Sequence, residues 1–98
     1  MTLTKQQEGS ELTVVVDGRL DTATAPQLEE MMKTSLDGVA KLTLDFSKLV
    51  YVSSAGLRVI LSAQKLMSKK GKLVVKNVQE AVRDVFEVTG FTGILTIE

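Results

Sequence analysis

Cysteine and histidine are both absent from this chain of 98 residues. Without cysteine the chain can form neither a disulfide framework nor a thiolate zinc site, and without histidine it lacks the usual general base and the commonest metal ligand. Most catalytic arrangements are thereby excluded. We therefore expect a binding protein rather than an enzyme, with no cofactor and no bound metal.

Excess charge and long apolar runs are missing as well. The 12 lysines and arginines balance the 12 aspartates and glutamates, and no basic block is present that would follow a phosphate backbone. No apolar run approaches the ~20 residues needed to cross a bilayer, and the N-terminus carries no apolar signal region. We expect a soluble cytoplasmic protein that neither contacts nucleic acid directly nor inserts into a membrane.

Strand and helix patterns alternate along the chain. Alternating apolar residues predict strands at 12–16 and 42–46, and a continuous apolar run predicts a buried strand at 73–75. The segment around Leu3 can pair with the first of these as a hairpin, and residues 94–97 are expected to form a last strand. Apolar residues at helical spacing predict three intervening helices. Their inner faces are formed by Ala25, Leu28, Met31, Met32 and Leu36, by Leu57, Ile60, Leu61 and Gln64, and by Val82, Val85, Phe86 and Thr89.

Strands that alternate with helices at this spacing imply right-handed crossovers and parallel pairing. If the strands are laid down in sequential order, every crossover leaves its helix on the same face of the sheet. We therefore predict an α/β fold in which residues 1–98 form a single domain. Its sheet is mixed but largely parallel, with four to five strands, and its helices lie mainly on one face.

Local motifs predict how these elements begin and end. Thr24 and Gln27 have the spacing of a capping box before the first helix. Asn77, followed three residues later by Glu80, has the same form before the third helix. The dipeptide at 17–18, Asp-Gly, favours an ordinary loop, because a helix follows it.

The most informative stretch runs from Asp45 to Arg58, where an apolar strand leads through two serines and a glycine directly into a helix. The first turn of a helix has N–H groups without partners and carries the positive end of the macrodipole, so it accepts a capping oxygen or a phosphate. Ser54 at this position has two interpretations, as a helix cap and as a site of modification. They are compatible, because a phosphate there leaves the fold intact while it changes the outer surface.

Residues 45–57, DFSKLVYVSSAGL, resemble the signature of STAS domains, in particular that of the bacterial anti-sigma factor antagonists. In that signature a strand beginning Asp-x-Ser leads through an aromatic residue to Asp-Ser-Ser/Thr-Gly-Leu. Two more segments are similar to the family's pattern. They are GRLD at 18–21 followed by Ala-Pro at 25–26, and VRDVF at 82–86 followed by Thr-Gly-Phe at 89–91. The resemblance thus extends over the whole chain.

The resemblance implies that Ser54 is the phosphorylated residue. Ser53 stands where the family has aspartate and is the alternative acceptor, while Ala55 removes the second hydroxyl of the motif. It further implies partner switching: the unphosphorylated protein binds an anti-sigma factor that is also a serine kinase, phosphorylation weakens the complex, and a serine phosphatase restores it. The alternative is a non-switching STAS accessory subunit of a transporter or a larger signalling complex, in which Ser54 would be only a cap.

The expected partner surface combines this helix start with the loop at 21–24. Parallel strands present their carboxyl ends along one edge of a sheet, so the loop should lie beside Ser54. Arg58, one turn into the helix, is suited to a partner carboxylate, although it can equally be a solvated side chain. The residues expected to bind the partner are Asp21, Thr22, Ser53, Ser54, Gly56 and Arg58.

Two other features carry structural interpretations. Asp21 and Asp45 fit loop-shaping hydrogen bonds better than an acid–base pair, because each lies beside a strand end or turn. Phe91, directly after Gly90, is compatible both with a buried contact and with an exposed anchor for a partner.

Overall fold

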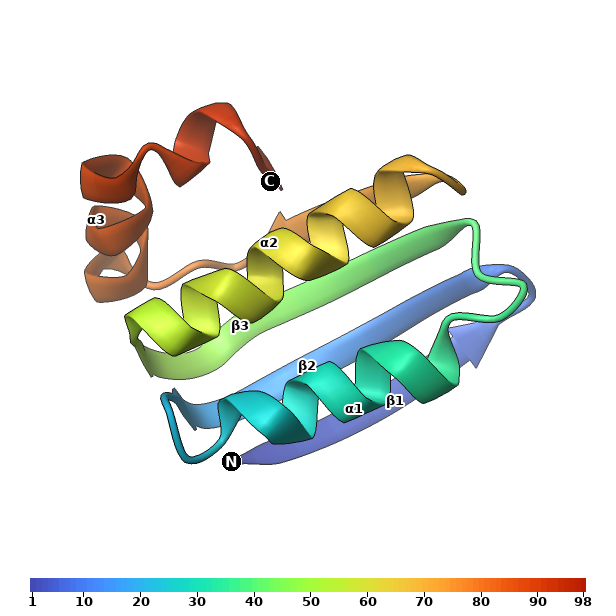
Figure 1. Cartoon of the computed structure of the whole chain (residues 1–98), viewed down its shortest axis with the longest axis horizontal. Helices are drawn as coiled ribbons and strands as arrows, with labels where there is room; N and C mark the ends of the chain where they lie inside the picture. The colour runs from blue at the N-terminus through green and yellow to red at the C-terminus, as the bar shows by residue number, and fades with distance from the viewer.

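The computed structural model describes residues 1–98 and contains one five-stranded sheet and three α-helices (Figure 1). In chain order the elements are β1 (Thr2–Glu8), β2 (Glu11–Leu20), α1 (Ala25–Ser35), β3 (Lys41–Val52), α2 (Ser54–Ser68), β4 (Lys72–Lys76), α3 (Glu80–Thr89), a short 3₁₀ helix η1 (Phe91–Gly93) and β5 (Thr96–Ile97). None of the helices is both long and apolar enough to span a membrane.

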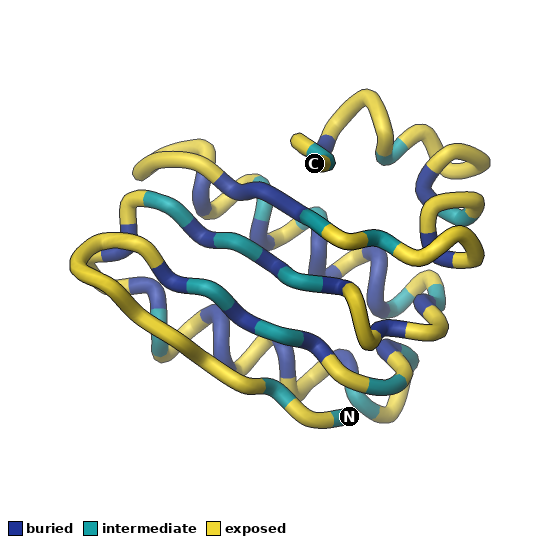
Figure 2. Tube along the Cα trace, turned by 180° about the vertical axis from the view of Figure 1, so that it is seen from behind, coloured by how far each residue is buried: buried dark blue, intermediate teal, exposed yellow.

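The strands lie in sequential order, β1-β2-β3-β4-β5, with β1 antiparallel to β2 and every later pair parallel. Sequential order with right-handed crossovers leaves the helices on the same face. Helices α1 and α2 lie side by side across that face, and the view from behind shows the strands in front of them (Figures 1 and 2). The predicted mixed, largely parallel sheet with helices mainly on one face is confirmed.

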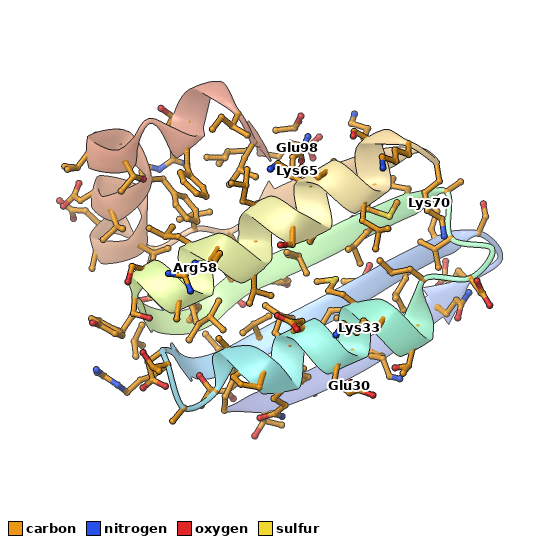
Figure 3. All side chains as sticks on the ribbon, in the orientation of Figure 1. Glu30, Lys33, Arg58, Lys65, Lys70 and Glu98 are labelled. Carbon is orange, nitrogen blue, oxygen red and sulfur yellow. The ribbon has the colours of Figure 1, made fainter.

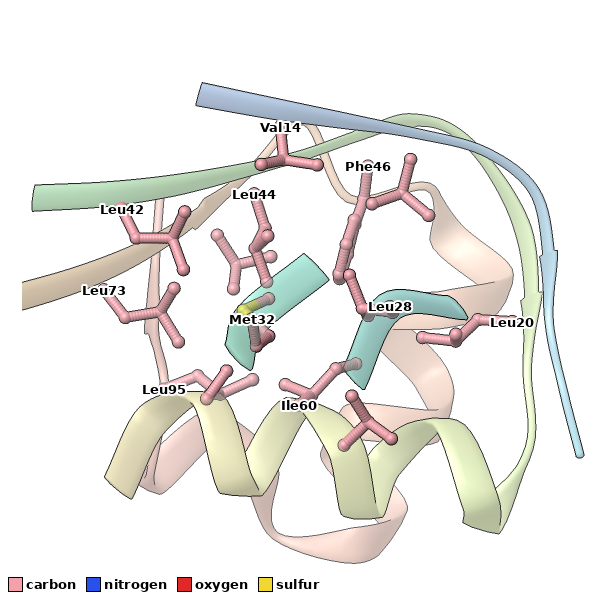
Figure 4. Packing of buried hydrophobic residues seen from close by; sticks show 14 of the residues in the cluster. Val14, Leu20, Leu28, Met32, Leu42, Leu44, Phe46, Ile60, Leu73 and Leu95 are labelled. Carbon is pink, nitrogen blue, oxygen red and sulfur yellow. The ribbon is translucent and has the colours of Figure 1, made fainter. Parts of the chain in front are cut away.

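The core lies between the sheet and these helices and contains 25 buried residues (Figure 4). The predicted inner face of α1 is fully buried, and β2 and β3 bury every second residue over the predicted stretches. Phe46 of β3 packs against Phe86 of α3, with ring centroids 6.3 Å apart. Phe91 stacks on the same Phe86 ring at 6.2 Å and is partly buried. It therefore belongs to the edge of the core.

The predicted capping box of α1 does not form. Thr24 occupies the N-cap position, but its hydroxyl donates to the carbonyl oxygen of Arg19 at 2.7 Å and accepts from the backbone N–H of Asp21 at 2.9 Å. Gln27 instead donates to the carbonyl oxygen of Met1 at 3.2 Å. The prediction is wrong because both side chains serve contacts outside the helix.

The predicted cap of α3 is wrong for a similar reason. The N-cap is Gln79 rather than Asn77, and its side chain donates to the carbonyl oxygen of Ser47 at 2.6 Å. Asn77 has a left-handed backbone, with φ of 59°, and its amide donates to Asp45 Oδ1 at 3.3 Å. The loop before α3 is thus tied to the middle of β3.

The predicted loop at 17–18 lies inside β2, which continues to Leu20. Irregular pairing with β3 accommodates it: the register shifts between Val15 and Asp17, and again between Gly18 and Arg19. As a result β2 runs as far as β3 does, and Leu20 pairs with Val52 immediately before the two serines.

Candidate partner-binding site

Ser53 caps helix α2. Its backbone is extended, with φ of −99° and ψ of 177°, and its Oγ accepts a hydrogen bond from the N–H of Gly56 at 3.4 Å. Its own backbone N–H donates to the carbonyl oxygen of Leu20 at 2.9 Å. The interpretation of Ser54 as the cap is therefore wrong by one residue.

Ser54 is the first residue inside α2 and is exposed. Its hydroxyl takes part in no hydrogen bond, in contrast to that of Ser53. The first turn of α2 contains no acidic residue, so no carboxylate of that turn offsets the partial positive charge of the helix start. A free hydroxyl at such a position is chemically suited to carry a phosphate.

Gly56 brings the start of α2 close to the sheet. A Cβ at this position would lie 2.7 Å from Leu20 Cγ, 2.8 Å from the Leu20 carbonyl oxygen and 2.9 Å from Val52 Cγ2. The residue is buried in the isolated chain, and its expected contact with a partner stays a prediction. Its role is packing, because only a residue without a side chain allows this approach.

The loop before α1 is held by its own hydrogen bonds. Asp21 Oδ1 accepts from the backbone N–H of Ala23 at 3.0 Å and from that of Thr24 at 3.1 Å. The backbone hydrogen bond from Thr24 holds the pKa of Asp21 below its ordinary value, helped by Ala23 and the Arg19 charge and opposed by desolvation. Arg19 lies 3.8 Å from the Asp21 carboxylate and 4.1 Å from the centre of the Tyr51 ring. Asp21 thus shapes the loop, as expected.

The structure brings Thr22 of this loop and Arg58 of α2 to one shallow hollow of about 280 Å³. Both are exposed, and Ala55 lines the hollow between them. Sequence reasoning missed Ala55 and Ser62, although 55, 58 and 62 share one helical face by their spacing. It also missed the contact between Arg19 and Tyr51, which depends on the irregular register of β2 and β3.

Asp45 belongs to a separate network. Burial alone would raise the pKa of its carboxyl, but hydrogen bonds from Ser47 and from the Asn77 side chain outweigh burial and leave the pKa lowered. The Ser47 N–H donates to Asp45 Oδ1 at 2.9 Å. Asp21 and Asp45 therefore each shape their own segment, and no three acidic residues gather into a metal-binding group.

Comparison with known proteins identifies the class. The family model described as "Mlab, STAS domain" matches residues 3–96. A candidate anti-sigma factor antagonist of Bordetella bronchiseptica, BtrV, is 37% identical over 99 residues, which cover 99% of this chain and 85% of the relative. The anti-sigma-B factor antagonist of Bacillus subtilis is 28% identical over 93 residues, which cover 94% of this chain and 85% of the relative. The chain belongs to the STAS domain family, among the anti-sigma factor antagonists.

Solved structures share the fold. An anti-sigma factor antagonist from Mycobacterium paratuberculosis superposes with a TM-score of 0.87 at 24% identity, over 98% of this chain and 83% of the other. The Bacillus cell fate determinant SpoIIAA in its phosphorylated form superposes with a TM-score of 0.76 at 17% identity, over 99% of this chain and 91% of the other. At these identities the likeness concerns the arrangement of the sheet and helices.

Proposed function

We propose that the chain is a phosphorylation-controlled antagonist of an anti-sigma factor and that Ser54 is its phosphoacceptor. The unphosphorylated protein binds an anti-sigma factor that is also a serine kinase, and this binding frees the sigma factor. Phosphorylation of Ser54 by that kinase, with ATP as the donor, weakens the complex, and a serine phosphatase restores it. We place this exchange in the cytoplasm, where sigma factors act on transcription.

The observation that carries the proposal is the separation of roles between Ser53 and Ser54. Ser53 supplies the cap, so the exposed Ser54 hydroxyl is not needed to hold the helix. A phosphate on Ser54 adds nearly two negative charges at the helix end that tolerates them best. Relatives named as anti-sigma factor antagonists support the class of partner.

The energy scale is sufficient for a switch. A dianion that is desolvated against an imperfectly matched partner costs several kcal/mol, whereas about 1.4 kcal/mol already changes an affinity tenfold. Ser54 is exposed and precedes Ala55, which lines one hollow with Thr22 and Arg58, so a partner that covers this hollow lies close to the phosphate.

Peptide mapping after reaction with the cognate anti-sigma kinase and ATP tests the acceptor. We expect phosphate on Ser54, lost in Ser54→Ala and retained in Ser53→Ala. Modification confined to Ser53, or none with a kinase that is active on a control substrate, contradicts the proposal. The alternative of a non-switching accessory subunit predicts no phosphate and no binding to an anti-sigma factor.

A further inference from the structure

A groove lies between helices α1 and α2, and its first lining residue on α2 is Ala55, which follows Ser54. The hollow that contains Thr22 and Arg58 shares Glu29, Val59 and Ser62 with a second hollow of about 360 Å³. Because the two hollows share these three residues, they adjoin and form one groove between α1 and α2, the two helices that lie side by side in Figure 3.

The far half of the groove is apolar. Met32, Ala63 and Leu66 line it, and Leu66 is 42% exposed although its side chain is large and apolar. From Arg58 to Leu66 the helix advances by about 12 Å, the length of roughly two helical turns. The groove thus has the dimensions and surface for a short apolar segment of another molecule.

Charge is distributed unevenly along the chain, and only part of it lines the groove. Residues 46–79, which include all of α2, contain no aspartate or glutamate but seven of the chain's 12 cationic residues. These are Lys48, Arg58, Lys65, Lys69, Lys70, Lys72 and Lys76. On the α1 side, Glu29 is paired with Lys33 at 3.3 Å. Of the three charged residues that line the groove, Arg58 is the one without an ion-pair partner; Figure 3 labels it on α2.

We propose that the groove between α1 and α2 receives a short apolar segment of the anti-sigma partner whose carboxylate pairs with Arg58, and that a phosphate on Ser54 releases this segment by binding Arg58 itself. The inference rests on the proposed function, since it takes Ser54 as the site of the phosphate. Charge complementarity selects the occupant, because Arg58 is the only charged residue that α2 contributes to the lining and it is unpaired, whereas Glu29 of α1 is paired with Lys33.

Helix geometry makes Arg58 available to both anions. Ser54 and Arg58 are four residues apart on α2, so their side chains are neighbours on the helix surface. An anion that lies four residues N-terminal to a cation has the favourable orientation of such pairs. The phosphate therefore removes the partner's counter-charge and places a like charge beside the partner's carboxylate.

Matched substitutions on α2 test the groove. Arg58→Gln removes the proposed counter-charge, and Ser62→Trp fills the groove, whereas Lys65→Gln and Ser68→Trp make the same changes outside its lining. Ser62 and Ser68 are matched positions: both are exposed, and the hydroxyl of each donates a hydrogen bond to a backbone carbonyl oxygen of the preceding turn. Calorimetry measures the affinity of each variant for the cognate anti-sigma kinase. We expect Arg58→Gln and Ser62→Trp each to bind about tenfold more weakly than the wild type, and the two control variants to change the affinity by less than about twofold. If each groove variant weakened binding no more than its control, the partner segment would not lie in this groove.

A titration of the phosphate tests the competition without any partner. Phosphoserine is incorporated at position 54 during translation, and its second pKa is followed by phosphorus NMR in the wild type, Arg58→Gln and Lys65→Gln. By helix spacing the neighbouring charge on α2 is that of Arg58, whereas the Asp21 carboxylate is engaged by Ala23, Thr24 and Arg19 of its own loop. We expect the second pKa to be about 0.4 units lower with Arg58 present than with glutamine, and unchanged by Lys65→Gln. Equal values in all three proteins overturn the proposal, whether or not the kinase modifies Ser54.

Discussion

The backbone N–H of Ser53 donates a hydrogen bond to the carbonyl oxygen of Leu20 at 2.9 Å. This bond continues the pairing of β2 with β3 one step beyond the Leu20–Val52 pair, so the sheet itself fixes the residue that caps α2. The position of Ser54 therefore depends on the buried ends of two strands. A phosphate added there lies at a position that the sheet determines.

Gly56→Ala is expected to destabilise the protein by about 1–3 kcal/mol, because the new methyl group would overlap Leu20 and Val52. Urea denaturation measures the change. Gly93→Ala is the matched control, since a Cβ there meets no atom within 4 Å. Equal stability of the two variants would contradict the close approach of α2 to the sheet.

Ser53→Ala should cost about 0.5–1 kcal/mol through the lost cap, at the low end of capping effects because its hydrogen bond is long at 3.4 Å. Ser54→Ala should stay within about 0.5 kcal/mol of the wild type, because its hydroxyl makes no hydrogen bond and is exposed. Thermal melts of the two variants compare them directly. If Ser54→Ala lost more stability than Ser53→Ala, Ser54 rather than Ser53 would be the cap of α2.

Asp45→Asn should reduce stability by about 1 kcal/mol at neutral pH, since it weakens hydrogen bonds that favour the ionised carboxylate. The pKa of Asp45 is lowered in the folded state, so its contribution is present above the ordinary pKa of 3.8 and is lost as the pH falls through the lower folded value. Denaturation curves between pH 7 and about pH 2 should show that the difference in the free energy of unfolding between the wild type and Asp45→Asn becomes smaller in acid. A gap that stays constant over this range would contradict the assignment.

Phe91→Ala should destabilise the protein by about 1–2 kcal/mol, because the ring stacks on Phe86 with an interplanar angle of 11°. Val88→Ala is the comparison on the neighbouring helix, because Val88 is 88% exposed and should change stability by less than about 0.5 kcal/mol. If chemical denaturation found Phe91→Ala as stable as the wild type, Phe91 would be a surface residue.

Apolar periodicity was sufficient to predict the fold, because burial follows the same period as the pattern. Leu12, Val14 and Val16 alternate in the sequence and are all buried in β2. The caps were predicted less well. Thr24 and Asn77 have the residue types of caps, but Arg19 and Asp45 engage their side chains instead. Asp45 lies 32 residues before Asn77, so no local pattern could reveal that bond.

The residue that caps α2 was predicted to within one position, whereas Ser54 as the phosphate acceptor stays a prediction. Two adjacent serines both suit a helix start, and only the backbone geometry shows that Ser53 caps while Ser54 is free. Gly56 was expected to contact the partner, and the structure shows it buried against Leu20 and Val52. The groove was not predicted, since the side formed by α1 depends on how the two helices pack.

Calorimetry with the cognate anti-sigma kinase tests the central claim most directly. It compares the unphosphorylated protein with the same protein carrying phosphoserine at position 54, while thermal melts check that both are folded. We predict at least about tenfold weaker binding for the phosphorylated form, with a melting temperature that is not lowered. Equal affinities of two folded forms would contradict the claim that a phosphate on Ser54 controls the complex.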